Sequence, residues 1–224
     1  MRIAIIGAGR VGRPLGAAFK AKGHQVVFGV REPDPTASIA TKTVDDAIAA
    51  ADVVILATPW TAAEALVCEH APQLAGKIVI DPTNPLNPGA TRLALGFDTS
   101  GAELLQSHAR TATVLKAFNV ASIDAITRPR YPQGHAMGFV AGPAGAKKEI
   151  VLSLVADIGF EPVDAGDLRA ARLLEPLGML RLQLADNWGK GRDFSFVLGA
   201  RDAAQLNPVR AAVGAGALEP IVGK

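Results

Sequence analysis

The glycine-rich run GAGRVG at residues 7–12 constrains the fold of this chain more than any other stretch. It follows a short apolar run of strand type at residues 3–6 and opens a helical pattern that extends to about residue 22. A second strand pattern comes next, at residues 25–30, so the glycines lie within a strand–helix–strand unit. In such a unit the glycines allow a tight turn, close approach of a pyrophosphate, and close helix packing. The stretch therefore predicts a dinucleotide site that includes Gly7, Gly9, Arg10, Val11 and Gly12.

The end of the second strand indicates which dinucleotide binds. NAD sites usually place an acidic side chain there for the ribose hydroxyls, whereas an arginine accommodates the 2′-phosphate of NADP. In this chain Gly29 occupies the position where the acidic side chain of an NAD site would be expected, and Val30 and Arg31 follow it. This pattern favours NADP, with Val30 and Arg31 in the cofactor site. In the competing interpretation Glu32 turns inward to the ribose and Arg31 is a solvated loop charge.

Strand and helix patterns alternate along most of the chain. After a proline-bounded loop at residues 33–43, Thr43 is placed to cap a helix that leads into a buried strand at residues 52–58. The alternation predicts an α/β fold, a Rossmann-type doubly wound parallel sheet with a small C-terminal α/β or helical extension. We expect residues 1–165 to form the dinucleotide domain and residues 166–224 to form a helical segment packed on it as one compact unit. Further strands are expected at residues 77–81, 111–119, 135–141 and 161–164, and helices at 61–70, 100–110, 122–127, 144–158 and 167–188, the last kinked or split at Pro176.

Two loops are expected at the sheet edge where open α/β sheets hold their ligands. The strand at residues 52–58 ends in Thr58, Pro59 and Trp60, and Trp60 either lies against the cofactor or caps the sheet. The segment 82–89 contains three prolines and two asparagines and must form a shaped loop. We assign Thr58, Pro59, Trp60, Asn84 and Ala117 to the cofactor site.

Composition excludes several other classes. A net charge of +2 without a Lys/Arg stripe argues against nucleic-acid binding, and the apolar runs are too short to span a bilayer. The first strand begins at the N-terminus and leaves no room for a signal peptide. The single cysteine, Cys68, excludes an internal disulfide, fits the reducing cytoplasm and is expected to be a buried structural residue. The histidines are too far apart to suggest a metal site, and none is predicted.

Five stretches, at residues 7–12, 29–31, 80–86, 116–120 and 164–177, together resemble the family of NADPH-dependent reductases of the deazaflavin coenzyme F420. The reductase domains of the STEAP ferric reductases look like more distant relatives. The family usually carries Ser or Thr before the arginine at the end of the second strand, and Val30 stands there in this chain. One hydrogen bond to the 2′-phosphate is therefore expected to be missing.

The resemblance implies direct hydride transfer between NADP(H) and a flat acceptor stacked against it, either F420 or a flavin. Such chemistry depends on orientation and exclusion of water, so no catalytic acid or base is assigned. Arg128 and Arg130 either meet an anionic tail of the acceptor or belong to a solvated turn. The acceptor pocket implied by the resemblance comprises Asn84, Pro85, Leu86, Phe118, Asn119, Met137 and Gly138.

Other interpretations remain open. Lys116 could act as a general acid/base, as in hydroxy-acid dehydrogenases, but those enzymes carry a large helical second domain, and we favour a structural or phosphate-neighbouring role. The substrate could instead be a small imine or keto acid, or the protein could be an NADPH-binding redox sensor, because fold does not determine function. The apolar helix at residues 167–188 predicts a homodimer, with no nucleic-acid or membrane partner.

Overall fold

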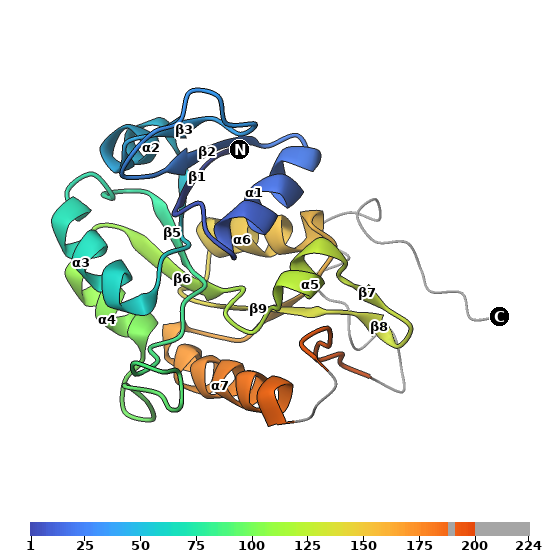
Figure 1. Cartoon of the computed structure of the whole chain (residues 1–224). Coiled ribbons are helices and arrows are strands. Elements are labelled where there is room, and N and C mark those ends of the chain that lie inside the picture. The colour runs from blue at the N-terminus through green and yellow to red at the C-terminus, as the bar shows by residue number, and fades with distance from the viewer. Residues whose placement is uncertain (188–190, 200–224) are drawn as a thin grey trace.

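The fold is a mostly parallel eight-stranded sheet with helices on both faces (Figure 1), in a computed structural model that describes residues 1–187 and 191–199. The strand order is β10-β9-β6-β5-β4-β1-β2-β3. This is the Rossmann-type arrangement that the sequence predicts, and the fold class is confirmed. The strands of this sheet are β1 Arg2–Ile6, β2 Gln25–Gly29, β3 Thr41–Lys42, β4 Val53–Leu56, β5 Ile78–Asp81, β6 Thr113–Ala117, β9 Met137–Ala141 and β10 Glu161–Asp164. The helices are α1 Gly12–Ala21, α2 Val44–Ala50, α3 Trp60–His70, α4 Gly101–His108, α5 Ile123–Thr127, α6 Ala146–Asp157 and α7 Ala171–Asn187, with a 3-10 helix η1 at Leu168–Ala170.

The sheet separates two hydrophobic cores, because successive strand residues point to opposite faces. In β1, Ile3 and Ile5 pack with residues of α1, α5 and α6, whereas Ala4 and Ile6 pack with residues of α2, α3 and α4. All four side chains are buried. Burial on both faces explains why the strands are almost uninterrupted apolar runs.

One pairing in the sheet is antiparallel. β9 pairs with β6 in the antiparallel sense, with Lys116 opposite Ala141, while every other pair in this sheet is parallel. After β6 the chain forms α5 and a small hairpin of β7 Arg130–Tyr131 and β8 Gly134–His135. These elements lie between β6 and β9, and no helix carries the chain back across the sheet, which a parallel strand would require. The expectation of an entirely parallel sheet, with a strand from residue 135, is corrected in this respect.

Local signals predict most of the helix boundaries correctly. The Thr43 hydroxyl accepts a hydrogen bond from the Asp46 amide and caps α2, as predicted. The loop at residues 33–43, in contrast, contains β3, which pairs with β2 and was not predicted.

Cys68 was predicted to be buried, and it is exposed. In α3 the buried positions are Ala63, Val67 and His70, and Cys68 is rotated about 100° from Val67 toward solvent.

The long C-terminal pattern forms η1 followed by α7, which remains one helix through Pro176. It packs beside α4 at the end of the sheet (Figure 1). Of the predicted 166–224 segment, residues 188–190 and 200–224 lie outside the described part of the chain. Within residues 1–187 and 191–199, no helix is both long and apolar enough to cross a membrane.

Candidate cofactor and acceptor site

The glycine loop between β1 and α1 has the geometry of a dinucleotide cradle. Gly7 has φ +104°, and a Cβ there would lie 2.6 Å from the carbonyl oxygen of Ala57. A Cβ at Gly12 would lie 2.0 Å from the Gly7 oxygen, so the helix can start at this point only with glycine. Gly9 differs, because a Cβ there would meet nothing within 4 Å. Protein packing therefore does not require a glycine at position 9, whereas a ligand that approaches the backbone would.

Two clefts flank this loop and share Thr58 and Pro59 as a common wall. The β2-side cleft, about 780 Å³, lies between the glycine loop, the end of β2 and the helices α2 and α3. The loop-side cleft, about 690 Å³, lies between the glycine loop, the end of β4 and the loop at residues 82–90. An extended ligand with two ring systems joined by a pyrophosphate fits such a pair of hollows, with the pyrophosphate at the start of α1.

Thr58 adds a polar group at the junction of the two clefts. Its hydroxyl oxygen is buried and has no hydrogen-bond partner among the described residues. Buried polar atoms are nearly always paired in folded proteins. The unpaired hydroxyl and the open space at Gly9 both fit a bound dinucleotide.

The β2-side cleft contains Val30, Arg31 and Glu32. A Cβ at Gly29 would lie 2.6 Å from the Ile6 side chain, so an acidic residue at this position would require the buried Ile6 side chain to move. Arg31 is exposed, and its guanidinium has no ion pair with the residues in the described part of the chain. Glu32 is exposed beside it. An unpaired guanidinium at this strand end suits the 2′-phosphate of NADP.

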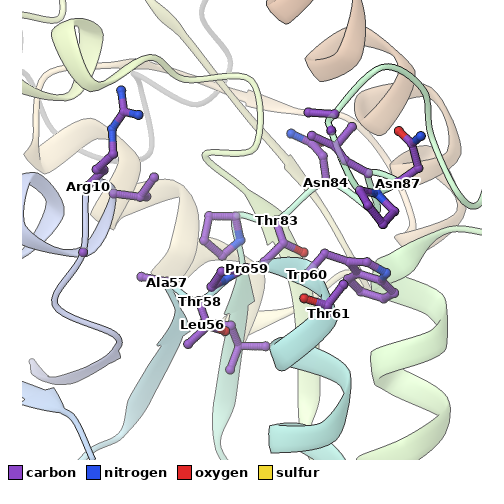
Figure 2. Close-up of a pocket in the computed structure, with 17 residues that line it drawn as sticks. Arg10, Leu56, Ala57, Thr58, Pro59, Trp60, Thr61, Thr83, Asn84 and Asn87 are labelled. Carbon is purple, nitrogen blue, oxygen red and sulfur yellow. The ribbon is translucent and has the colours of Figure 1, made fainter.

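The loop-side cleft is closed on one side by the shaped loop (Figure 2). Asn84 and Asn87 line it from this loop, across from Arg10 at the glycine loop, as Figure 2 shows. Leu86 of the same loop is also part of the lining. The side chain of Asn87 shapes the loop, since its Oδ1 accepts hydrogen bonds from the amides of Thr91 and Arg92 at 3.0 and 2.9 Å. Of the seventeen lining residues only Arg10 has an ionisable side chain.

Asn84 is held in place by a side-chain network. Its Nδ2 donates to the Asn119 carbonyl oxygen at 2.9 Å, and Asn119 Nδ2 donates back to Asn84 Oδ1 at 2.8 Å and to the Leu174 carbonyl oxygen at 2.7 Å. A Cβ at Gly178 would lie 2.7 Å from Asn84 Oδ1, so the backbone of α7 rests against this amide. Leu174 and Gly178 of α7 therefore help to fix the position of Asn84, a cleft residue that precedes Leu174 by 90 positions in the chain.

A buried ionic cluster lies beneath the shaped loop. Lys116 Nζ is 2.7 Å from Asp81 Oδ2, from Glu175 Oε1 and from the Thr83 carbonyl oxygen, and all three charged side chains are fully buried. Asp81 Oδ1 in turn accepts hydrogen bonds from the amide and hydroxyl of Thr83. Lys116 is therefore a structural residue that joins β5, the shaped loop and α7, and it does not face either cleft.

Glu175 also caps a neighbouring helix. Its carboxylate accepts hydrogen bonds from the amides of Gly101 and Ala102 at 3.0 and 3.3 Å, at the start of α4. Burial raises the pKa of Glu175, and the Lys116 ammonium and the Gly101 amide oppose this shift. An acidic group at a helix N-terminus interacts favourably with the helix dipole. The sequence did not reveal this cluster, because its members lie up to 94 positions apart in the chain.

Several predicted acceptor residues lie away from both clefts. Phe118 is packed edge-on between Phe19 and Phe160 in the core, and a Cβ at Gly138 would lie 2.2 Å from Val155 of α6. Their role is packing. The structure does bring Phe118, Asn119, Met137 and Gly138 together, but around a narrow space with no room for a water molecule.

Two other assignments are corrected for the same reason. Ala117 is fully buried in the β6 core, and Pro85 is buried beneath the shaped loop, so neither lines a cleft. Gly12 provides the close helix packing expected of the third glycine, and it does not itself line a cleft. Arg128 forms an exposed ion pair with Asp193 at 2.8 Å, and Arg130 lies exposed in the β7–β8 hairpin.

Trp60 lies between the loop-side cleft and α4. It lines the loop-side cleft, while its indole ring packs on α4, where a Cβ at Gly101 would lie 2.9 Å from the ring.

The sequence did not point to five further lining residues. Thr61 and Asn87 line the loop-side cleft, and Val44, Ala62 and Leu66 line the β2-side cleft. Across residues 1–187 and 191–199, no group of three or more His, Cys, Asp and Glu side chains is arranged to hold a metal ion.

The sheet topology, glycine loop and paired clefts define a Rossmann-type dinucleotide-binding protein. The family profile "NADP oxidoreductase coenzyme F420-dependent" matches residues 2–85. An F420-dependent NADP reductase of Methanothermobacter thermautotrophicus is 28% identical over 207 residues, covering 82% of this chain and 89% of that protein. A solved structure assigned as an F420-dependent NADP reductase from an Arthrobacter species matches with a TM-score of 0.81 at 29% identity, covering 89% of this chain and all of that one.

A third relative, metalloreductase STEAP3 of Rattus norvegicus, is 32% identical over 192 residues. The match covers 84% of this chain but only 38% of the length of STEAP3. The resemblance to the NADPH-dependent F420 reductases is thus confirmed, and the comparisons support an NADP-dependent oxidoreductase.

Proposed function

We propose that this protein transfers a hydride between NADP(H) and a flat acceptor of the deazaflavin or flavin type in the loop-side cleft. The observation that carries the proposal is the lining of that cleft, in which Arg10 is the one ionisable side chain of seventeen residues. A cleft without a carboxylate, histidine, lysine or tyrosine suits a reaction in which the two cofactors supply the chemistry. The name of the Methanothermobacter relative supports F420 as the acceptor.

The role of the protein is to hold the two ring systems face to face. NADPH supplies the hydride when bound, and the accompanying proton that completes acceptor reduction comes from solvent. The backbone amides at the start of α1 and the Thr58 hydroxyl hold the dinucleotide, while Arg31 selects the 2′-phosphate. Asn84 is fixed by Asn119 and α7, so it offers a rigid amide at the far wall of the cleft. Such preorganisation is the main means by which a site of this kind accelerates a reaction.

The test is anaerobic mixing of the purified protein with NADPH, and in parallel with NADH, in the presence of F420, FMN, a cyclic imine or no acceptor. Nicotinamide absorbance reports turnover. Rapid oxidation of NADPH with F420 or FMN, and much slower oxidation of NADH, is the expected result. Turnover with the imine alone would replace the proposal with imine reduction, and tight NADPH binding without any turnover would favour a redox sensor. A Gly9→Val variant is the control, since a Cβ at position 9 would meet no protein atom within 4 Å and the added side chain would occupy the proposed cofactor space.

A further inference from the structure

Arg10 carries the one charge among the seventeen residues that line the loop-side cleft. It follows Gly9 in the glycine loop, its side chain is exposed, and it forms no hydrogen bond or ion pair with the described residues. The first turn of α1, which begins two residues later, contains no acidic side chain that could neutralise it. The N–H donors of the guanidinium are therefore free to bind a ligand.

The glycine loop divides the two clefts and places Arg10 on one side of the division. Residues 6–8 line the β2-side cleft, whereas residues 9–11 line the loop-side cleft. Thr58 lies at the junction of the clefts, where the pyrophosphate of the dinucleotide is expected. Arg31, the residue suited to the 2′-phosphate, lines the β2-side cleft. Arg10 is therefore on the side that we propose for the acceptor.

The rest of the loop-side cleft is neutral. Leu56 and Ala57, from the end of β4, and Pro82, just after β5, are part of its lining. Figure 2 shows the Arg10 side chain directed away from Leu56 and Ala57. Because a charged group is costly to bury without a partner, a ligand that matches this lining has an uncharged flat body and one anionic group at the Arg10 end.

This distribution of charge distinguishes between kinds of acceptor. A protonated imine is a cation, and it would meet the Arg10 guanidinium in a cleft whose lining includes no carboxylate. A flavin or deazaflavin with a phosphate on its side chain has a flat neutral ring system and an anionic end. The planar guanidinium of arginine matches phosphate with two parallel N–H donors.

The two arginines that the sequence suggested for an anionic tail do not compete for this role. Arg128 is paired with Asp193, and neither Arg128 nor Arg130 lines either cleft.

We propose that Arg10 is a specificity-determining residue that binds the phosphate on the side chain of a flavin or deazaflavin acceptor. The protein then discriminates phosphorylated acceptors from the same ring systems without phosphate. This inference rests on the proposed function, because it names the class of acceptor for that site. The phosphate contact at Arg10 directs the ring system into the neutral part of the cleft, beside the nicotinamide. Arg10 holds the acceptor in place and takes no part in the transfer of the hydride.

Equilibrium binding to protein saturated with NADP⁺ tests the proposal without any turnover. Two matched pairs of ligands are compared, FMN with riboflavin, and F420 with its deazaflavin ring system lacking the phosphate-linked tail. Fluorescence of the ring system reports each Kd. The wild-type protein is expected to bind the phosphorylated member of a pair at least about tenfold more tightly at low ionic strength. The difference is expected to shrink as salt is added, because Arg10 is exposed.

Substitutions at position 10 assign the difference to the guanidinium. Arg10→Gln is expected to bind both members of a pair with the affinity that the wild type shows for the unphosphorylated one, with little change in the Kd for NADP⁺. Arg10→Lys is expected to keep part of the preference, since an ammonium group carries the charge without the planar fork. Lys22→Gln is the matched control, because it removes an exposed positive charge at the opposite end of α1 and is expected to behave as the wild type does.

Equal affinities within both pairs in the wild-type protein, or no binding of either ring system, would overturn the proposal. An Arg10→Gln variant that loses affinity for NADP⁺ but keeps the preference for phosphate would also overturn it, because Arg10 would then serve the pyrophosphate. The two proposals can fail separately. Binding of FMN through Arg10 without oxidation of NADPH would contradict the proposed hydride transfer alone. Turnover of FMN and riboflavin with equal KM would contradict the role of Arg10 alone.

Discussion

Two cations near the sheet edge, Arg31 and Lys116, differ in exposure and in pairing. Arg31, at the β2 end of the paired clefts, is exposed and has no ion-pair partner in the described chain. Lys116 lies beneath the other end, where it is fully buried and contacts two carboxylates. Both are cations within a few residues of a strand end. Arg31 is available to a ligand, because it follows β2 and stands in solvent. Lys116 is unavailable, because α7 brings Glu175 over it. The comparison shows that a charge at this sheet edge is available to a ligand only where no later element covers it.

The two ends also differ in how they control shape. At the glycine loop the backbone itself forms the cleft surface, and the cleft has space there because glycine has no side chain. At the shaped loop, buried side chains that never reach the cleft hold Asn84 and Thr83 in position. We therefore expect substitutions of Gly9 and Arg31 at the first end to change ligand binding alone, and substitutions at the second end to change stability first.

The largest effect is expected from Lys116→Met, which leaves the Asp81 and Glu175 carboxylates buried without their cation. Removing one partner of a buried ion pair typically costs about 3–5 kcal/mol. Chemical denaturation should show a loss of this size in the free energy of unfolding. Lys148→Met is the matched control: Lys148 is also buried, but its partner Asp164 is 43% exposed and stays solvated, so a smaller loss is expected. Equal losses in the two variants would remove the distinction between them.

Gly9→Val should weaken cofactor binding and leave the stability of the fold unchanged. Because a Cβ at position 9 would meet no protein atom within 4 Å, the melting temperature without ligand should hold, while the Kd for NADPH rises by more than about 100-fold. Titration of intrinsic or nicotinamide fluorescence measures the Kd. Gly96→Val, in a loop where the nearest atom is 4.0 Å away, should bind NADPH as the wild type does. Unchanged affinity in Gly9→Val would mean that the dinucleotide does not pass over this loop.

Arg31→Ala should reduce selectivity rather than binding in general. A charge-assisted hydrogen bond contributes roughly 1.5–3 kcal/mol, so the preference for NADPH over NADH should fall by about tenfold or more. Affinity for NADH should hardly change. Competitive titrations with both cofactors report the ratio, and Arg110→Ala, at the far end of α4, should leave it unaltered. If Glu32→Gln weakens NADH binding while Arg31→Ala has no effect, the alternative in which Glu32 holds the ribose is correct.

The smallest effect concerns the ion pair that anchors the start of α7. Hydrogen bonds from Arg172 lower the pKa of Glu103 below its usual value near 4.5. A lowered carboxyl pKa stabilises the fold above the unfolded-state value, and the stabilisation is lost as the pH falls through the folded-state value. Glu103→Gln should therefore cost about 0.5–1 kcal/mol near neutral pH and nothing in strong acid. Urea denaturation at several pH values tests this, with the exposed Glu149→Gln expected to show no such trend.

The sequence by itself determined the features that depend on neighbouring residues. Glycines at positions 7, 9 and 12 impose the cradle because steric freedom is a local property, and the unbroken apolar strands impose a sheet buried on both faces. Arg31 was identifiable because it follows the second strand directly. The resemblance to F420 reductases was also visible in short stretches of sequence, and the comparisons confirm it.

Only the tertiary structure decided which strand-end residues line a cleft. Phe118, Met137 and Gly138 occupy positions that suggested an acceptor pocket, yet α6 and the aromatic cluster around Phe118 pack over them. The same applies to Cys68, whose exposure depends on the rotation of α3 against the sheet. The Lys116 cluster joins residues up to 94 positions apart, and β9 is antiparallel to β6 because the connection stays at the carboxyl end of β6 and does not return to its start. These properties arise from long-range packing, which local sequence patterns do not encode.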